Sequence, residues 1–153
     1  MSKKLTVQRY QLYTISAGYA ARALIYLACN GKAGPIQVQK IASAESIPKY
    51  FLAKILNCLS QKDMVESVKG PGGGFCLSRP ASRIKVGQIL ELFNGVEHLD
   101  QICILGLDKC QEKKSCALHK EWKKFRQTLK KRVAQLTIED LKRERERKRS
   151  RIQ

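Results

Sequence analysis

The chain has 153 residues, with 30 Lys or Arg against 13 Asp or Glu and a formal net charge of +17. This length suits one domain with a core, or a small domain with an extension, and excludes a large multidomain enzyme. Hydrophobic residues make up 43% of the chain, so the sequence is not that of a disordered polycation. A charge of this size favours a polyanionic partner, either nucleic acid or an anionic membrane surface.

No segment of the sequence has the pattern of a targeting or membrane-spanning element. The first ten residues contain basic side chains but no following apolar run of the kind that a secretion signal needs. No span approaches the ~18 apolar residues of a membrane helix. We therefore expect a cytoplasmic protein with reduced thiols, and the cysteines need another explanation than disulfides. There are six of them: Cys29, Cys58, Cys76, Cys103, Cys110 and Cys116.

The first part of the chain has the periodicity of three helices. Apolar residues at helical spacing predict a core helix over residues 16–28 that stops at Asn30-Gly31. A short helix over residues 38–44 follows, and after a turn Pro48 suits the first position of a helix that runs to about Gln61. The inward face of this third helix is predicted to consist of Leu52, Ile55, Leu56 and Leu59. Two short helices joined by a tight turn, the second with a basic outer face, predict a helix-turn-helix.

A β-hairpin is predicted directly after the helix-turn-helix. Residues 64–69 contain β-branched side chains, the glycine-rich run 70–74 turns the chain, and residues 75–77 return as a second strand. This arrangement is typical of a wing, and the flanking Lys69 and Arg79 would bring positive charge toward DNA. The glycine run also suggests a phosphate loop, but that loop needs Gly-Lys-Ser/Thr opening a helix, whereas here Ser78-Arg79-Pro80 follows a strand.

The second part of the chain contains a long helix with a narrow apolar stripe. A fourth helix over residues 86–93 is followed by an irregular segment, and then the stripe begins. A narrow stripe over residues 118–136 favours pairing with the same helix of a second copy, although it could also pack on its own domain. The stripe consists of Leu118, Trp122, Phe125, Leu129, Val133 and Leu136.

A capping box at residues 137–140 predicts that the long helix breaks near Leu136 and that a short last helix begins. Residues 142–151 hold seven basic and two acidic residues, a composition typical of a mobile tail or a frayed helix. We therefore expect a DNA-binding domain over 1–95, a cysteine loop over 96–117, a dimerisation helix with a short final helix over 118–141, and a basic tail over 142–153.

Three cysteines and a histidine crowd into the irregular segment. Cys103, Cys110 and Cys116 are separated by six and five residues, and His119 follows three positions later. Thiolates select zinc, copper(I) or iron-sulfur clusters. The short knuckle of a structural zinc site is missing, and an iron-sulfur cluster tolerates wider spacing, so the cluster is favoured. The remaining cysteines lie on regular elements beside apolar residues and are predicted to be buried packing residues.

Three segments resemble the Rrf2 family of bacterial winged-helix regulators, and most closely its members that bind iron-sulfur clusters. These segments are 19–24 (YAARAL), 47–56 (IPKYFLAKIL) and 68–75 (VKGPGGGF), and the resemblance extends over residues 16–141. It implies a homodimer whose long C-terminal helices cross, with a cluster near the dimerisation helix and His119 as its fourth ligand. Gly18 stands where nitric-oxide sensors of the family carry an acidic cluster ligand. Ala53 stands where cluster-binding members carry a glutamate that tunes which DNA sites are bound.

The expected fold is mainly α: a winged helix-turn-helix with a two-stranded wing, then a cysteine loop and a long dimerisation helix. The expected function is a dimeric DNA-binding transcriptional regulator, not an enzyme, that binds a palindromic double-stranded operator. Basic residues gather on the recognition helix, the wing and the tail without an amphipathic membrane stripe, which favours DNA over a membrane. The predicted DNA-binding residues are Lys49, Tyr50, Lys54, Lys69, Gly70, Pro71 and Gly72.

The expected sensor is an iron-sulfur cluster, 2Fe-2S in preference to 4Fe-4S, that responds to iron-sulfur status, redox state or nitric oxide. Its predicted ligands are Cys103, Cys110, Cys116 and His119. One alternative is a cluster-free winged-helix repressor of the same family that senses through thiols or a protein partner. A more distant alternative is a small redox protein or electron carrier, although no C-x-x-C motif or nucleotide fingerprint is present.

Overall fold

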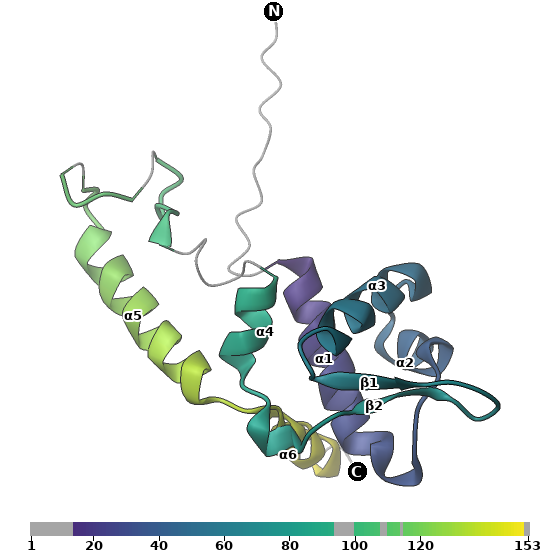
Figure 1. Cartoon of the computed structure of the whole chain (residues 1–153). Helices are drawn as coiled ribbons and strands as arrows, with labels where there is room; N and C mark the ends of the chain where they lie inside the picture. Colours follow the sequence, from purple (N-terminus) through teal and green to yellow (C-terminus); the bar gives the residue numbers. More distant parts are fainter. Residues whose placement is uncertain (1–13, 94–99, 108–109, 114, 152–153) are drawn as a thin grey trace, which may run out of the picture.

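The computed structural model describes residues 14–93, 100–107, 110–113 and 115–151. It is mainly helical, with one two-stranded antiparallel sheet (Figure 1). Within the described residues no helix is both long enough and apolar enough to span a membrane. The elements in chain order are α1 (Ile15–Asn30), η1 (Gly31–Ala33), α2 (Val38–Glu45), α3 (Lys49–Ser60), β1 (Val65–Val68), β2 (Gly74–Leu77), η2 (Ala81–Arg83), α4 (Val86–Leu92), α5 (His119–Gln135) and α6 (Ile138–Ser150).

The predicted helix-turn-helix is confirmed, and its core lies between α1, α2 and α3. The Thr14 side chain caps α1 by accepting a hydrogen bond from the Ala17 amide, which satisfies one of the amides that a helix start leaves unpaired. The predicted inward face of α3 is buried, because residues at a spacing of three and four share one side of a helix. Its members are Leu52, Ile55, Leu56 and Leu59, each at most 3% exposed.

The turn between α2 and α3 is fixed by backbone geometry. Ser46 ends α2 in the left-handed region, with φ 51°, and the Ile47 amide donates to the Ala42 carbonyl over 3.0 Å. This is the hydrogen bond of a Schellman cap, which reverses the chain in few residues. Pro48 precedes α3 as its cap instead of filling its first helical position, so the prediction for Pro48 differs from the structure by one residue.

The predicted wing is formed by β1 and β2. Their antiparallel register pairs Val65 with Leu77 and Val68 with Gly74. Ile36 adds a further bridge, in which Ile36 and Phe75 exchange two backbone hydrogen bonds of 2.8 Å. A Cβ atom at Gly74 would lie 2.4 Å from the Ile36 carbonyl oxygen, so this close approach of the two backbones requires glycine.

The last two helices pack on different parts of the winged domain. Helix α5 lies beside α4 on the side away from α1, whereas α6 packs against α1 (Figure 1). The junction is held by backbone hydrogen bonds from Val86 to Leu136, 2.9 Å, and from Ile138 to Ile84, 3.0 Å. The capping box predicted at Thr137 and Asp140 is present.

Two further expectations differ from the structure. Residues 142–150, expected as a basic tail or frayed end, continue α6, because Leu141 and Arg145 pack toward the winged domain. Cys29, Cys58 and Cys76 are half-buried instead of buried. The predicted boundary between residues 95 and 96 lies outside the described residues.

The apolar stripe of α5 is only partly covered within one chain. Trp122 is 6% exposed, whereas Phe125 is 49% exposed and Leu118 is 43% exposed. Leu129, Val133 and Leu136 are half-buried. A stripe of large apolar side chains that its own domain leaves partly exposed is available for another surface.

Candidate functional site

The outer face of α3 carries the predicted DNA-binding side chains. Lys49, Tyr50 and Lys54 are all exposed, and Tyr50 reaches 73% exposure. The Lys54 ammonium lies 4.5 Å from the centroid of the Tyr50 ring, within the range of a cation–π contact. The structure therefore brings two of the predicted residues into direct contact, with a positive charge and a hydrogen-bonding hydroxyl side by side.

Phe51 is a surface residue of α3 that the prediction did not include. It is 43% exposed, and its ring meets that of Tyr19 on α1 edge-on, with centroids 6.1 Å apart. Arg22 lies 5.8 Å from the same Tyr19 ring. The signal was available in the sequence, since Phe51 falls outside the periodic apolar face of α3.

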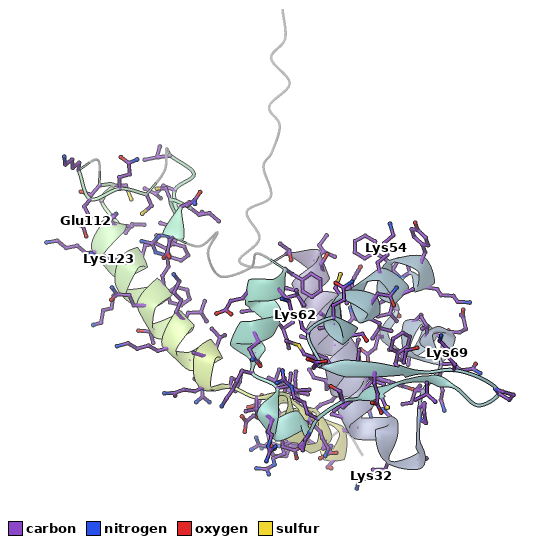
Figure 2. All side chains as sticks on the ribbon, in the orientation of Figure 1. Lys32, Lys54, Lys62, Lys69, Glu112 and Lys123 are labelled. Atoms are coloured by element: carbon purple, nitrogen blue, oxygen red, sulfur yellow. The ribbon has the colours of Figure 1, made fainter. Side chains whose placement is uncertain are left out.

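The predicted wing residues Lys69, Gly70, Pro71 and Gly72 form the exposed turn of the hairpin. The turn is closed by a hydrogen bond of 3.0 Å from the Gly73 amide to the Gly70 carbonyl. Lys54 and Lys69 extend from α3 and the hairpin, at the side of the domain remote from α5 (Figure 2). Arg79, predicted to flank the turn, follows the opposite end of β2 and donates to Gln88 over 3.4 Å.

The four predicted cluster ligands come together as two pairs. The Cys103 and Cys116 Sγ atoms are 3.7 Å apart, and the Cys110 Sγ lies 3.3 Å from His119 Nδ1. Cys116 precedes α5, whose first residue is His119, so the two do not share a helical face; the His119 amide instead donates to the Cys116 carbonyl over 3.0 Å. Within the described part of the chain, no three His, Cys, Asp or Glu side chains meet closely enough to hold a single metal ion.

Trp122 anchors the cysteine loop to α5. Its indole Nε1 donates to the Ile102 carbonyl over 2.8 Å, directly before Cys103. The ring stacks on Phe125 with centroids 5.6 Å apart, and the Arg126 guanidinium lies 5.7 Å from the Trp122 centroid. The indole thus sets where the first cysteine lies relative to the helix that carries His119.

The surroundings of Cys103 favour its thiolate. Hydrogen bonds lower the pKa of the Cys103 thiol below its ordinary value, although burial opposes this shift. The bond from the Leu105 backbone amide has the largest effect, followed by those with the Cys116 thiol and the amides of Leu107 and Gly106. Successive backbone amides that point at one atom form an anion-binding concavity. The thiolate is the form that binds metal.

The donor set fits an iron-sulfur cluster. His119 is 8% exposed, and its Nε2 atom is buried without a hydrogen-bond partner among the described residues. A buried ring nitrogen in that condition is costly unless it binds something. Three sulfur atoms and one imidazole are also the ligand types that an iron-sulfur centre accepts.

A helix-turn-helix followed by a two-stranded wing defines the winged-helix class of DNA-binding protein. The Rrf2 family model, "Iron-dependent Transcriptional regulator", matches residues 13–144, and the chain belongs to this family. It is 36% identical over 132 residues to an HTH-type transcriptional regulator of Aquifex aeolicus strain VF5, which covers 85% of this chain and 90% of the relative. Its relatives are transcriptional regulators and not enzymes.

The chain is also similar to the HTH-type transcriptional regulator IscR of Escherichia coli O1:K1, with 32% identity over 110 residues, 72% of this chain and 67% of IscR. Solved structures share its fold. The structure of CymR, the global cysteine regulator of B. subtilis, aligns with a TM-score of 0.69 at 22% identity. The alignment covers 84% of this chain and 94% of the CymR chain. The structure of T. potens IscR aligns with a TM-score of 0.64 at 21% identity, and the alignment covers 86% of this chain and 85% of the IscR chain.

Proposed function

We propose that this Rrf2-family regulator binds a palindromic DNA operator as a homodimer. Helix α3 enters the major groove with Lys49, Tyr50 and Lys54, and the wing brings Lys69 and the turn over residues 70–72 to the adjacent backbone and minor groove. The exposure of these side chains on one domain supports this placement. The partly exposed stripe of α5 supports a second copy as the dimer partner.

We further propose that Cys103, Cys110, Cys116 and His119 hold an iron-sulfur cluster, 2Fe-2S in preference to 4Fe-4S, as in the relatives that the ligand pattern resembles. The observation that carries this proposal is the buried Nε2 of His119, which has no hydrogen-bond partner among the described residues, on a ring whose Nδ1 lies 3.3 Å from the Cys110 Sγ. The Cys103–Cys116 pair lies in the same region of the chain. When bound, such a cluster supplies a centre that responds to redox state, iron supply or nitric oxide.

The residues of the chain prepare this loop for the cluster. The amides of residues 105–107 stabilise the Cys103 thiolate, and Trp122 fixes the loop on α5 through Ile102. Because His119 begins α5, any change in how the loop is held acts at the start of that helix. A shift of α5 changes the relative orientation of the two winged domains in the dimer. Operator affinity then changes, because the two orientations bind the operator with different affinities.

The test is purification under anaerobic conditions from iron-replete cells, with iron, acid-labile sulfide and visible absorption measured per chain. We expect a coloured protein that contains iron and sulfide, and loss of both in Cys110→Ala. Cys58→Ala is the matched control, because Cys58 is a half-buried thiol on α3, and it should retain the cluster. Colourless, iron-free protein would overturn the cluster proposal and leave the DNA-binding proposal standing.

A second candidate is a cluster-free regulator that senses oxidation through its thiols. The distance of 3.7 Å between Cys103 and Cys116 Sγ supports it, because a small movement would bring them to the ~2.05 Å of a disulfide. The likeness to the fold of CymR, named as a cysteine regulator, is compatible with it. Counting free thiols before and after mild oxidation of the iron-free protein tests this candidate: Cys103 and Cys116 should be lost together.

A further inference from the structure

A buried carboxylate lies at the end of α2, outside both sites described above. Glu45 is the last residue of α2 and is 5% exposed. Only Ser46, Ile47 and Pro48 separate it from the first residue of α3. A buried carboxylate is costly unless it is paired and hydrogen-bonded, so the groups that hold Glu45 are important for the position of this turn.

Two arginines from different helices hold this carboxylate, one on each oxygen. Arg145 Nη2 on α6 donates to Glu45 Oε1 over 2.5 Å. Arg22 Nε on α1 donates to Glu45 Oε2 over 3.4 Å. Arg145 lies 100 residues after Glu45 in the sequence, and the shorter of the two bonds therefore joins the C-terminal helix to the helix-turn-helix.

The start of α6 is fixed to a different part of the molecule. Ile138, fully buried, donates to the Ile84 carbonyl, and Leu136 accepts from the Val86 amide. Leu136 directly follows α5. Helix α6 thus connects the junction with α4 and α5, at its start, to the α2–α3 turn, through Arg145 near its middle.

The turn itself transmits the position of Glu45 to α3. Ser46 is held in the left-handed region and Ile47 is hydrogen-bonded back to Ala42, so the backbone between the two helices has little freedom. A displacement of Glu45 carries the first residues of α3 with it, and these include Lys49 and Tyr50.

We propose that Glu45 is a positioning residue for DNA recognition: Arg145 and Arg22 hold its carboxylate, and the C-terminal helix α6 thereby sets the orientation of α3 that reads the operator. This rests on the proposed reading of DNA by α3. It assigns to Arg145 a role that joins two parts of the protein, whereas Lys142, Arg143 and Arg147 pair with acidic residues of α6 itself.

The experiment compares Arg145→Gln with Arg147→Gln on two DNA duplexes. The duplexes are one enriched by the wild-type protein from a random pool and a scrambled version of it. Both variants remove one positive charge from α6, but the Arg147 partner is Glu144 within the same helix. We expect Arg145→Gln to lose about tenfold in affinity for the enriched duplex and less than about twofold for the scrambled one. Arg147→Gln should change neither beyond about twofold.

Two further readouts separate positioning from a direct phosphate contact and from misfolding. The dependence of affinity on salt should have the same slope for both variants, because neither arginine is assigned to a phosphate. Glu45→Gln combined with Arg145→Gln should lose no more than Glu45→Gln alone, and Arg145→Lys should recover part of the affinity. Should Arg145→Gln unfold, Arg22→Gln replaces it, because Arg22 is 44% exposed and makes the longer bond.

The inference is overturned if Arg145→Gln and Arg22→Gln, folded by circular dichroism, bind the enriched duplex as the Arg147→Gln control does. Equal losses on the enriched and scrambled duplexes would also overturn it, since they indicate a nonspecific charge effect. A wild-type protein that does not discriminate between the duplexes contradicts the proposed function itself. That result is distinguishable from failure of the positioning role alone.

Discussion

The winged domain and the cysteine region differ in what holds their residues in place. In the domain, α3 buries Leu52, Leu56 and Leu59 completely, and glycine at position 74 allows the wing to approach Ile36. In the cysteine region the large apolar side chains point outward: Ile104, Leu105, Leu107, Leu118 and Phe125 are all between 43% and 62% exposed.

Among the described residues, the contacts that hold the cysteine region are mostly polar. They include the Trp122 bond to Ile102 and ion pairs from Lys123 to Glu112 and from Lys130 to Asp100. Exposed ion pairs of this kind stabilise little. The winged domain is thus packed within one chain, and this contrast supports the proposal made above that a bound group and a second copy complete the cysteine region.

The largest expected effect comes from the same substitution made in both regions. Leu56→Ala should lower the free energy of unfolding by about 2–5 kcal/mol, because it leaves a cavity in a packed core. Leu107→Ala should change it by less than about 0.5 kcal/mol, since Leu107 is 62% exposed. Urea unfolding of the iron-free protein measures both. Similar losses at the two positions would remove the contrast between the regions.

A smaller effect is expected from Trp122→Phe, which keeps an aromatic ring but removes the donor to Ile102. The unpaired carbonyl should cost about 1–3 kcal/mol locally, so amides of residues 100–107 should exchange hydrogen faster while those of α3 do not. Hydrogen exchange with mass spectrometry measures this. Thr128→Val is the control, because Thr128 is exposed on the same helix and its hydroxyl donates to the Lys124 carbonyl within α5. Unchanged exchange in the loop would show that Trp122 does not anchor it.

The Lys69→Ala variant tests whether the winged domain and the cysteine region differ in their contacts with DNA. A lysine at the wing that contacts a phosphate should, when removed, weaken binding to all duplexes and reduce the slope of log affinity against log salt by about 1. Lys123→Ala on α5 removes the same charge at the opposite side of the molecule (Figure 2) and should leave the slope unchanged. Fluorescence anisotropy over a series of salt concentrations gives both slopes. Equal slopes for the two variants would exclude a phosphate contact at Lys69.

Most of the winged domain could be predicted from the sequence, because each element buries one face against its neighbours. Residues such as Leu52 and Leu56 recur with the helical period, and the glycines between β1 and β2 mark the hairpin turn. The ligand-type residues of the cysteine loop could also be found, because they crowd together in an otherwise irregular segment.

Other features depend on contacts between distant residues, which a local pattern does not contain. The spacing of Cys103, Cys110 and Cys116 does not tell which of them pairs with which, because that depends on the path of the loop past Trp122. The charge of residues 142–151 predicted a tail, whereas Ile138, Leu141 and the Arg145–Glu45 pair hold the segment as a helix. The composition of this segment predicted the exposed, basic side of α6 but not the side that packs against the winged domain.

The smallest expected effect lies at the junction between the two regions, where Asp140 closes the capping box of α6. Hydrogen bonds from the Thr137 hydroxyl and the Thr137 backbone amide hold the pKa of Asp140 below its ordinary value. A carboxylate with a lowered pKa in the folded state stabilises the protein above the pKa of the unfolded chain, about 3.9. This contribution is lost as the pH falls through the lowered pKa of the folded state.

Asp140→Asn should therefore lower the melting temperature at neutral pH and flatten its fall below about pH 4. Glu144→Gln is the control, because it removes a carboxylate from the same helix that is 60% exposed and only loosely paired, 3.9 Å from Arg147. Thermal unfolding of the iron-free protein at several pH values measures both variants. The capping box is important for the junction only if the pH dependence changes for Asp140→Asn and not for the control. In that case α6 is anchored at two points, by Asp140 at its start and by the Arg145–Glu45 pair near its middle, and loosening either anchor should affect how α3 is held.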